Sequence, residues 1–134
     1  MEKKYLAKII AKDTQGLQLI SAICFKAEIK LTEIKFLQKN KIFLLSMLRF
    51  RRETKDTDVK INSICKFEFV DTVKSKNIDQ TDKNLVLKLM NIDLLKNKNN
   101  YEISLIFSNN TYISLSTEII EVTLEDQNKD ILND

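Results

Sequence analysis

The sequence predicts an α+β fold: mainly an antiparallel sheet, curved or folded into two layers, with one N-terminal helix against it. Short runs of alternating apolar and polar residues recur along the chain, Asn-rich turns separate several of them, and one early run has helical spacing instead. With 134 residues, of which 43% are hydrophobic and 31% charged, the chain has the size and composition of one domain. We therefore expect a single domain over residues 1–134, with a frayed tail at 127–134.

A strand and a helix are predicted first. Residues 5–11 form a short apolar segment suited to a strand, and Asp13 with Thr14 offers an N-cap to a helix over 14–26. Gly16 in the first turn costs that helix about 1 kcal/mol relative to Ala. The apolar face expected to pack on the sheet consists of Leu17, Ile20, Cys24 and Ala27, with Leu19 and Ile23 beside them.

Strand segments and a charged loop follow the helix. Residues 29–37 alternate, and residues 42–50 are apolar on both faces, which is typical of a central strand covered on each side. Residues 52–60 are charged and aperiodic, as expected of a loop. The half-buried strand predicted at 61–69 places on one face Ile61, Ser63, Cys65, Phe67 and Phe69.

The next segments alternate less regularly. Residues 71–84 are polar, and we expect a long loop anchored by Val73 and Ile78. Residues 85–95 begin as a strand, but the apolar residues change parity before Ile92, which indicates a bulge or a helical turn.

A hairpin over residues 101–117 is the clearest pattern near the C-terminus. Asn109 and Asn110 suit the positive φ angles of its two-residue turn, and a last strand is expected at 120–124. The alternative fold, a small split barrel of the pleckstrin-homology type, requires a helix at 118–132.

The composition excludes several kinds of chemistry. Histidine is absent, which removes the commonest general base and metal ligand, and a single glycine excludes the glycine-rich phosphate loops. Cys24 and Cys65 lie among apolar neighbours, so we expect buried, reduced thiols. We expect no metal and no cofactor, and the residues favour a non-enzymatic role. A hydrolase that uses carboxylates alone stays open. The acidic residues are expected to be solvated: Asp56, Asp58, Glu118, Glu121, Glu125 and Asp126.

The sequence also bears on location. No apolar run approaches the ~20 residues that span a bilayer, and the N-terminus lacks the pattern of a signal peptide. We therefore expect a cytoplasmic protein without a membrane partner.

Three arginines stand together in a chain that otherwise uses lysine: Arg49, Arg51 and Arg52. Because guanidinium groups bind phosphate and carboxylate in a bidentate manner, they are candidates for a site that binds an anion, RNA or an acidic partner. The competing interpretation is that they pair with Glu53, Glu68 or other local carboxylates and close the sheet edge.

Two hypotheses for function follow. The first is a binding or assembly module with a protein partner, or one that self-associates through apolar residues left on the hairpin, such as Ile106 and Tyr112. The second is an RNA- or phosphate-binding domain that uses the three arginines.

Motifs along nearly the whole chain resemble the alphaproteobacterial domain-of-unknown-function family number 2948. They include the run from Phe43 to Leu48-Arg49-Phe50-Arg51-Arg52-Glu53, and Val73-Lys74-Ser75-Lys76-Asn77-Ile78-Asp79. The chain departs from the family at Arg52, where an aromatic residue is usual, and at Asn109-Asn110, where glycines are usual. The resemblance implies a small cytoplasmic protein and assigns no activity.

Overall fold

One antiparallel sheet accounts for most of the chain. The computed structural model describes residues 6–51 and 59–127, and within them ten strands form a single sheet. The helical elements are α1 (Thr14–Ile23) and the short 3₁₀ turns η1 (Leu31–Glu33) and η2 (Gln38–Asn40). The strands are β1 (Lys8–Ala11), β2 (Ala27–Lys30), β3 (Ile34–Leu37), β4 (Ile42–Phe50), β5 (Lys60–Phe67), β6 (Val70–Lys76), β7 (Val86–Lys96), β8 (Tyr101–Phe107), β9 (Thr111–Thr117) and β10 (Val122–Asp126).

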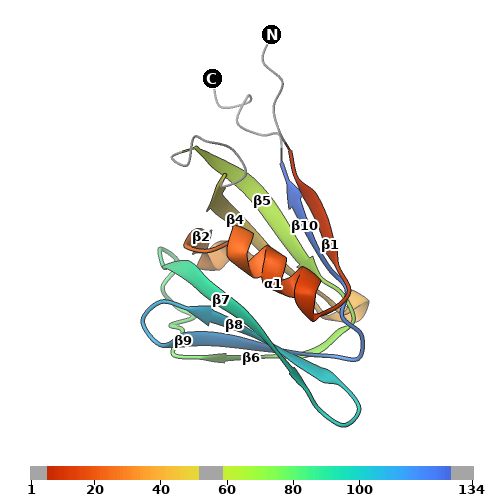
Figure 1. Ribbon diagram of the computed structural model, residues 1–134. Helices are drawn as coiled ribbons and strands as arrows, with labels where there is room; N and C mark the ends of the chain where they lie inside the picture. Colours follow the sequence, from red (N-terminus) through yellow and green to blue (C-terminus); the bar gives the residue numbers. More distant parts are fainter. Residues whose placement is uncertain (1–5, 52–58, 128–134) are drawn as a thin grey trace.

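The sheet folds over into two layers without closing. Its order is β1-β10-β5-β4-β2-β7-β8-β9-β6, and β3 pairs separately with β4. Figure 1 shows β1, β10, β5 and β4 in one layer and β7, β8, β9 and β6 in the other. Strand β2 joins the layers because it pairs with both β4 and β7. The predicted curved antiparallel sheet with one N-terminal helix is confirmed.

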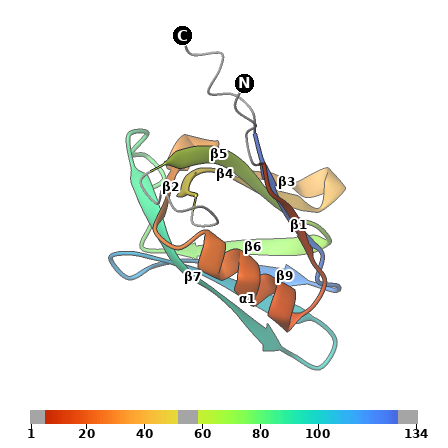
Figure 2. The same ribbon diagram turned by 45° about the horizontal axis from the view of Figure 1, so that its top comes forward.

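The core lies between the layers, and α1 covers it on the side between β1 and β7 (Figure 2). Alternate residues of each strand point inward, as the pleat requires, and Phe43 of β4 meets Phe67 of β5 with ring centroids 6.0 Å apart. Neither Cys24 nor Cys65 forms a disulfide, and both are fully buried, as expected. The outward residues of β4 are half-buried, so that strand is fully buried on one face only.

Helix α1 begins as predicted and ends earlier. The Asp13 side chain caps it by accepting a hydrogen bond from the Gly16 N–H at 2.8 Å. The helix stops at Ile23 because the backbone turns at Lys26, which has φ 67°. The Lys26 N–H donates to the carbonyl of Leu89 on β7, and β2 begins at the next residue. Leu19, expected on the packed face, is 51% exposed.

Several strand boundaries differ from the prediction. The segment 29–37 is interrupted by η1, and β2 already begins at Ala27. The strand expected to end at residue 69 ends at Phe67, because Phe69 adopts φ 60° in the turn and its side chain is 40% exposed. Residues 71–84 are not a continuous loop, since most of the first half forms β6.

The C-terminal half follows the prediction more closely. The register of β7 against β8 shifts between Leu89 and Asn91, so of the two alternatives, a bulge or a helical turn, the bulge is found. Both Asn109 and Asn110 have positive φ angles in the β8–β9 turn. The pleckstrin-homology alternative is wrong for the described residues, because 122–126 form strand β10. Of the expected loop 52–60 and tail 127–134, residues 52–58 and 128–134 lie outside the described part of the chain.

Candidate functional site

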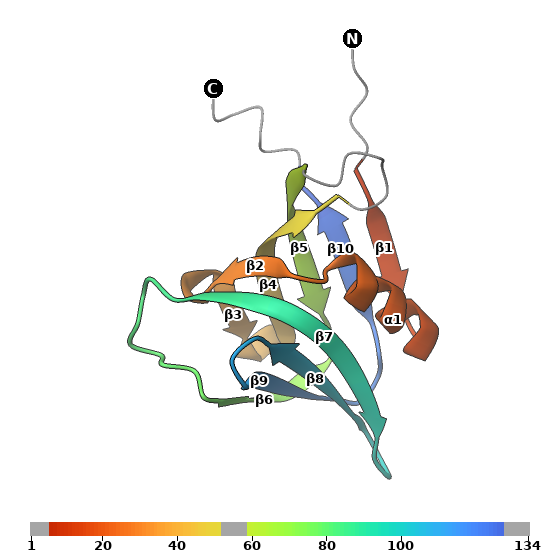
Figure 3. The same cartoon turned by 60° about the vertical axis from the view of Figure 1, so that its left-hand side comes forward.

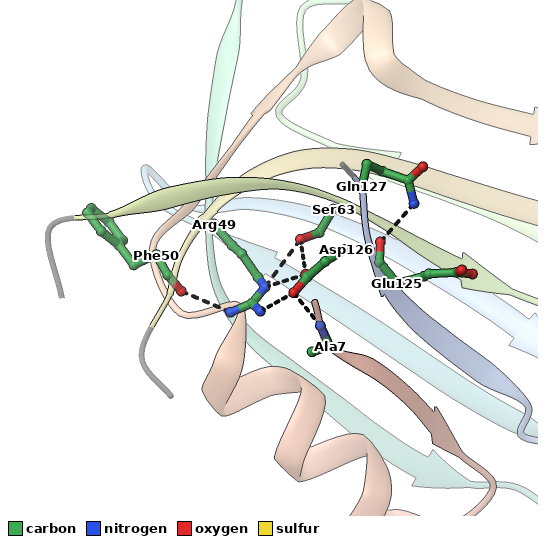
Figure 4. A network of polar contacts seen from close by, with 7 residues as sticks. All are labelled: Ala7, Arg49, Phe50, Ser63, Glu125, Asp126 and Gln127. Carbon is green, nitrogen blue, oxygen red and sulfur yellow. Dashed lines mark hydrogen bonds and ion pairs between the residues drawn. The ribbon is translucent and has the colours of Figure 1, made fainter. Parts of the chain in front are cut away.

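Arg49, the first of the three candidate arginines, lies inside the molecule. It is the last inward-facing residue of the alternating β4 strand and has no exposed surface. Its guanidinium binds both oxygens of Asp126, with Nε 3.0 Å from Oδ1 and Nη2 2.8 Å from Oδ2 (Figure 4). The same side chain donates to Ser63 Oγ at 3.2 Å and to the carbonyl of Phe50 at 3.0 Å. A solvent-borne phosphate therefore has no access to this guanidinium in the folded protein.

Asp126 completes this buried network, contrary to the expectation of a solvated carboxylate. It also accepts hydrogen bonds from Ser63 Oγ at 2.6 Å and from the backbone N–H of Ala7 at 2.7 Å. Burial on its own raises the pKa of Asp126, but the hydrogen bonds from Arg49, Ser63 and Ala7 and the charge of Arg49 outweigh it, so the pKa is lowered. Alternation signalled the position, since Asp126 continues the inward series of Val122 and Leu124.

The other two candidate arginines, Arg51 and Arg52, are not part of the buried network around Arg49 as far as the structure describes them. Arg51 follows β4, is half-buried, and its backbone N–H donates to the carbonyl of Val59 at 2.8 Å. Arg52 lies outside the described residues. The structure therefore does not bring the three guanidinium groups together on one described surface.

Ile106 and Tyr112 face each other across the β8–β9 hairpin. Both point outward, and Tyr112 is 37% exposed while Ile106 is half-buried. The neighbouring outward pair on this face is Ser104 with Ser114, so the apolar patch is small.

A hollow between strands β3 and β6 is the candidate site that the sequence did not predict. It has a volume of about 290 Å³ and lies between the two sheet layers. We call it the β3–β6 groove, and its walls are Leu31, Ile34, Phe36, Phe43, Val73, Ser75, Ile78, Gln80 and Ile113. Figure 3 shows β3 and β6 on the side of the molecule away from α1. The groove is therefore an apolar opening into the core on the side that the helix does not cover.

Both strands that flank the groove have a free edge. Within the described residues β3 pairs only with β4, and β6 pairs only with β9. After Val70, no backbone group on the outer side of β6 forms a backbone hydrogen bond to another described residue. Unpaired strand edges carry backbone N–H and C=O groups that are ready to bond to another extended chain.

One end of the groove is held shut. The N–H of Val70 donates to the carbonyl of Lys41 at 2.8 Å, and Lys41 Nζ lies 3.0 Å from Asp71 Oδ1. The hydrogen bond that Lys41 donates to Asp71 and the negative charge of Asp71 raise the pKa of Lys41. At the other end, Ile78 and Gln80 of the β6–β7 connection line the wall. The gap between the two strands is therefore fixed at the Lys41 end.

The sequence concealed this groove because a bulge changes the parity of β6. The register against β9 shifts between Val70 and Thr72, so Val70 and Val73 both face inward although they are three residues apart. Strict alternation is lost, and the segment resembles a polar loop. Val73 and Ile78, predicted as anchors, are indeed packed against the core.

Two further features of the described residues bear on the kind of site. No group of three or more His, Cys, Asp or Glu side chains in this part of the chain could hold a metal ion. Among the same residues, no helix is long and apolar enough to cross a membrane.

Comparison with known proteins gives a family and no further relative. A family model described as "Protein of unknown function (DUF2948)" matches residues 7–133. No curated protein and no solved structure matches the chain. The match covers nearly all of the sequence, and the chain therefore belongs to the DUF2948 family.

Proposed function

We propose that the protein is a cytoplasmic, non-enzymatic binding module that takes an extended segment of another protein into the β3–β6 groove. The observation that carries this proposal is the combination of two free strand edges with an apolar wall between them. An extended peptide can satisfy the backbone groups of an edge strand while its alternate side chains enter a pocket. The groove offers both kinds of contact.

The apolar side chains in the wall of the groove are partly exposed to solvent, which favours the binding of a partner there. Phe43 and Ile113 form its floor and are almost fully buried, whereas Ile34, Phe36, Val73 and Ile78 are only partly buried. Covering these partly exposed side chains removes apolar surface from water, at roughly 25 cal/mol per Å². At the closed end, the backbone hydrogen bond from Val70 to Lys41 and the exposed ion pair of Lys41 with Asp71 join β6 to the turn between η2 and β4.

The arginine hypothesis has less support. A phosphate- or RNA-binding site built from Arg49, Arg51 and Arg52 requires accessible guanidinium groups, and Arg49 is fully buried against Asp126. Phosphate contacts would also make binding fall steeply with salt. A salt titration with single-stranded RNA distinguishes this alternative.

Self-association through Ile106 and Tyr112 is likewise less well supported. Specific interfaces bury on the order of 800 Å² on each partner, whereas this patch consists of two apolar side chains beside serines. Light scattering of the wild type and of Tyr112→Lys at high concentration distinguishes it.

Peptide selection followed by mapping tests the proposed function. A display library of random peptides is selected on the folded protein, and the amide signals that a selected peptide shifts are assigned by NMR. We expect the shifts to concentrate in Ile34–Leu37 and Val70–Lys76. Peptides that map elsewhere, or a selection that yields none, would contradict the proposal.

Two variants and a control sharpen this test. Val73→Glu places a charge in the wall, and Ser75→Arg fills the groove from an exposed position that tolerates substitution. Both should abolish peptide binding. Leu95→Glu is the control, because Leu95 is 58% exposed on β7 and does not line the groove. It should bind as the wild type does, and thermal melts check that each variant is folded.

A further inference from the structure

We propose that the segment bound in the β3–β6 groove is an acidic strand, with apolar side chains facing inward and Asp or Glu side chains facing outward. This inference rests on the proposed function and specifies the chemistry of the partner. It follows from which residues of β3 and β6 point into the groove and which point away from it.

The outward residues on both sides of the groove are mainly lysines. On β3, Lys35 lies opposite Leu44 and faces outward. On β6, Lys74 lies opposite Ser114 and Lys76 lies opposite Tyr112, and both are exposed. A strand inserted between β3 and β6 would have its outward side chains flanked by these lysines from both sides. Opposite charges on adjacent strands attract and like charges repel, so carboxylates fit these positions best.

The described carboxylates near the groove form no ion pair with these lysines. Glu102 borders the same surface as Lys74 and Lys76 but is in ion-pair contact with neither. Asp71 is engaged by Lys41, and Asp79 accepts hydrogen bonds from the N–H and the hydroxyl of Thr81. No ion pair joins Lys35, Lys74 or Lys76 to another described residue. The rim of the groove therefore presents a positive charge on both strands.

The inward-facing residues of β3 and β6 determine which side chains the bound strand places toward the core. Ile34 and Phe36 of β3 and Val73 of β6 face the interior, with Ser75 next to them. A guest side chain that enters between them leaves water for an apolar wall, so a charged or amide side chain there would lose its hydration without a partner. Alternation along an extended chain then places apolar residues at every second position.

The closed end of the groove limits how many residues of the bound segment can pair with β3 and β6. Because Val70 already bonds to Lys41, the free edge of β6 starts after it and runs to Lys76. The free edge of β3 spans Ile34–Leu37. Because an extended segment also rises about 3.3 Å per residue, roughly four to six residues of the bound segment can pair with these two edges.

Three synthetic peptides test the charge preference. They alternate Val with Glu, Val with Gln, or Val with Lys, and their binding to the full chain is measured by calorimetry at low and at physiological salt. We expect the Glu peptide to bind roughly tenfold tighter than the Gln peptide, because several charge pairs each contribute a few-fold, and the Lys peptide to bind weakest. The difference in affinity between the Glu and Lys peptides should decrease as the salt concentration rises.

Charge reversal identifies the lysines responsible. The double variant Lys74→Glu with Lys76→Glu should bind the Lys peptide better than the Glu peptide. Lys96→Glu with Lys98→Glu is the matched control, because it makes the same change in net charge at exposed positions that do not line the groove. That control should keep the wild-type preference.

A backbone-modified peptide tests insertion as a strand. N-methylation of alternate residues of the Glu peptide removes backbone donors from one of its two edges, and it should abolish binding. Protection of the β3 and β6 edge amides from hydrogen exchange should appear with the unmodified peptide. Binding that survives methylation on either edge would overturn the inserted strand.

The outcomes separate this inference from the proposed function. Equal binding of all three peptides at the groove overturns the acidic preference and leaves the proposed function standing. No peptide binding, together with dimers that Ser75→Arg abolishes, makes a second copy of the chain the occupant and overturns the inference. RNA binding that depends on Lys74 and Lys76, without peptide binding, overturns both proposals.

Discussion

At the scale of single residues, Arg49 and Asp126 form the most consequential contact of the described chain. Removing two charges from water costs several kcal/mol for each ion, and their attraction offsets this only when the geometry is good and the remaining polar groups are satisfied. Here the bidentate pairing, the Ser63 hydroxyl and the Ala7 N–H meet those conditions. The network also ties β4, β5, β10 and the approach to β1 together (Figure 4).

Replacing Asp126 with Asn should therefore destabilise the fold strongly. The substitution leaves the buried guanidinium of Arg49 without a counter-charge, and breaking such a pair costs about 3–5 kcal/mol of unfolding free energy. Urea denaturation measures the change. Glu125→Gln is the control, because its side chain is exposed on the other face of β10, and surface changes stay within about 0.5 kcal/mol.

The double variant Arg49→Met with Asp126→Leu separates the charge from the packing. It removes both ions together, so no uncompensated charge remains, and it should lose less stability than Asp126→Asn alone. A double variant as unstable as the single one would contradict this account of the network.

The pH dependence of stability should carry the signature of Asp126. Its pKa is lower in the folded protein than its ordinary value of 3.8, so the unfolded chain binds the proton more tightly. The carboxylate contributes its full stabilisation above the unfolded pKa, and this is lost as the pH falls through the folded pKa. We expect the difference in unfolding free energy between wild type and Asp126→Asn to shrink below about pH 4. A constant difference from pH 7 to pH 2 would contradict it.

At the scale of elements, the single glycine of the chain shows tertiary packing overriding helix propensity. Propensity alone makes Gly16 a weakness of α1 relative to Ala. A Cβ atom at this position, however, would lie 2.9 Å from both Cα and Cβ of Ala11 in β1. The helix can approach β1 this closely because residue 16 has no side chain.

Gly16→Ala should accordingly destabilise the protein, although it improves the propensity of the helix. The backbone of Ala11 has to move, and overpacking of this kind costs roughly 1–3 kcal/mol. The propensity gain of about 1 kcal/mol offsets part of this. Thermal denaturation gives the sign directly. Gln18→Ala, at an exposed position of the same helix, is the control and should be neutral or slightly stabilising. A Gly16→Ala variant more stable than the wild type would show that β1 can shift at little energetic cost.

Local features of the elements could be predicted, and features set by distant partners could not. The Asn109-Asn110 turn and the β7 bulge depend on residues close in sequence; the turn was predicted, and the bulge was one of the two alternatives predicted there. Asp126 was assigned to the surface because its partner Arg49 is 77 residues away. The β3–β6 groove was missed for a related reason, since the β6 bulge conceals its alternation and β3 is remote in the chain.

At the scale of the whole molecule, the two layers and the helix share one hydrophobic core. Buried residues from α1, from β4 and β5, and from β7, β8 and β9 belong to the same cluster. Cys24, at the C-terminal end of α1, and Cys65, on β5, are both fully buried in it. If the core unfolds as one unit, the two thiols become accessible in the same event.

Thiol labelling should therefore proceed at the same rate at both cysteines. Burial, and secondarily the nearby Cys24, raise the pKa of the Cys65 thiol well above its ordinary value, so little of Cys65 is present as the reactive thiolate in the native protein. We expect slow labelling that tracks the equilibrium fraction unfolded as urea is added, measured for each cysteine by mass spectrometry of peptides. A burial-independent control comes from fully unfolded protein, in which both thiols should react at comparable rates. Faster labelling of Cys24 alone in the native protein would mean that α1 opens separately from the sheet, and the core would then unfold in more than one step.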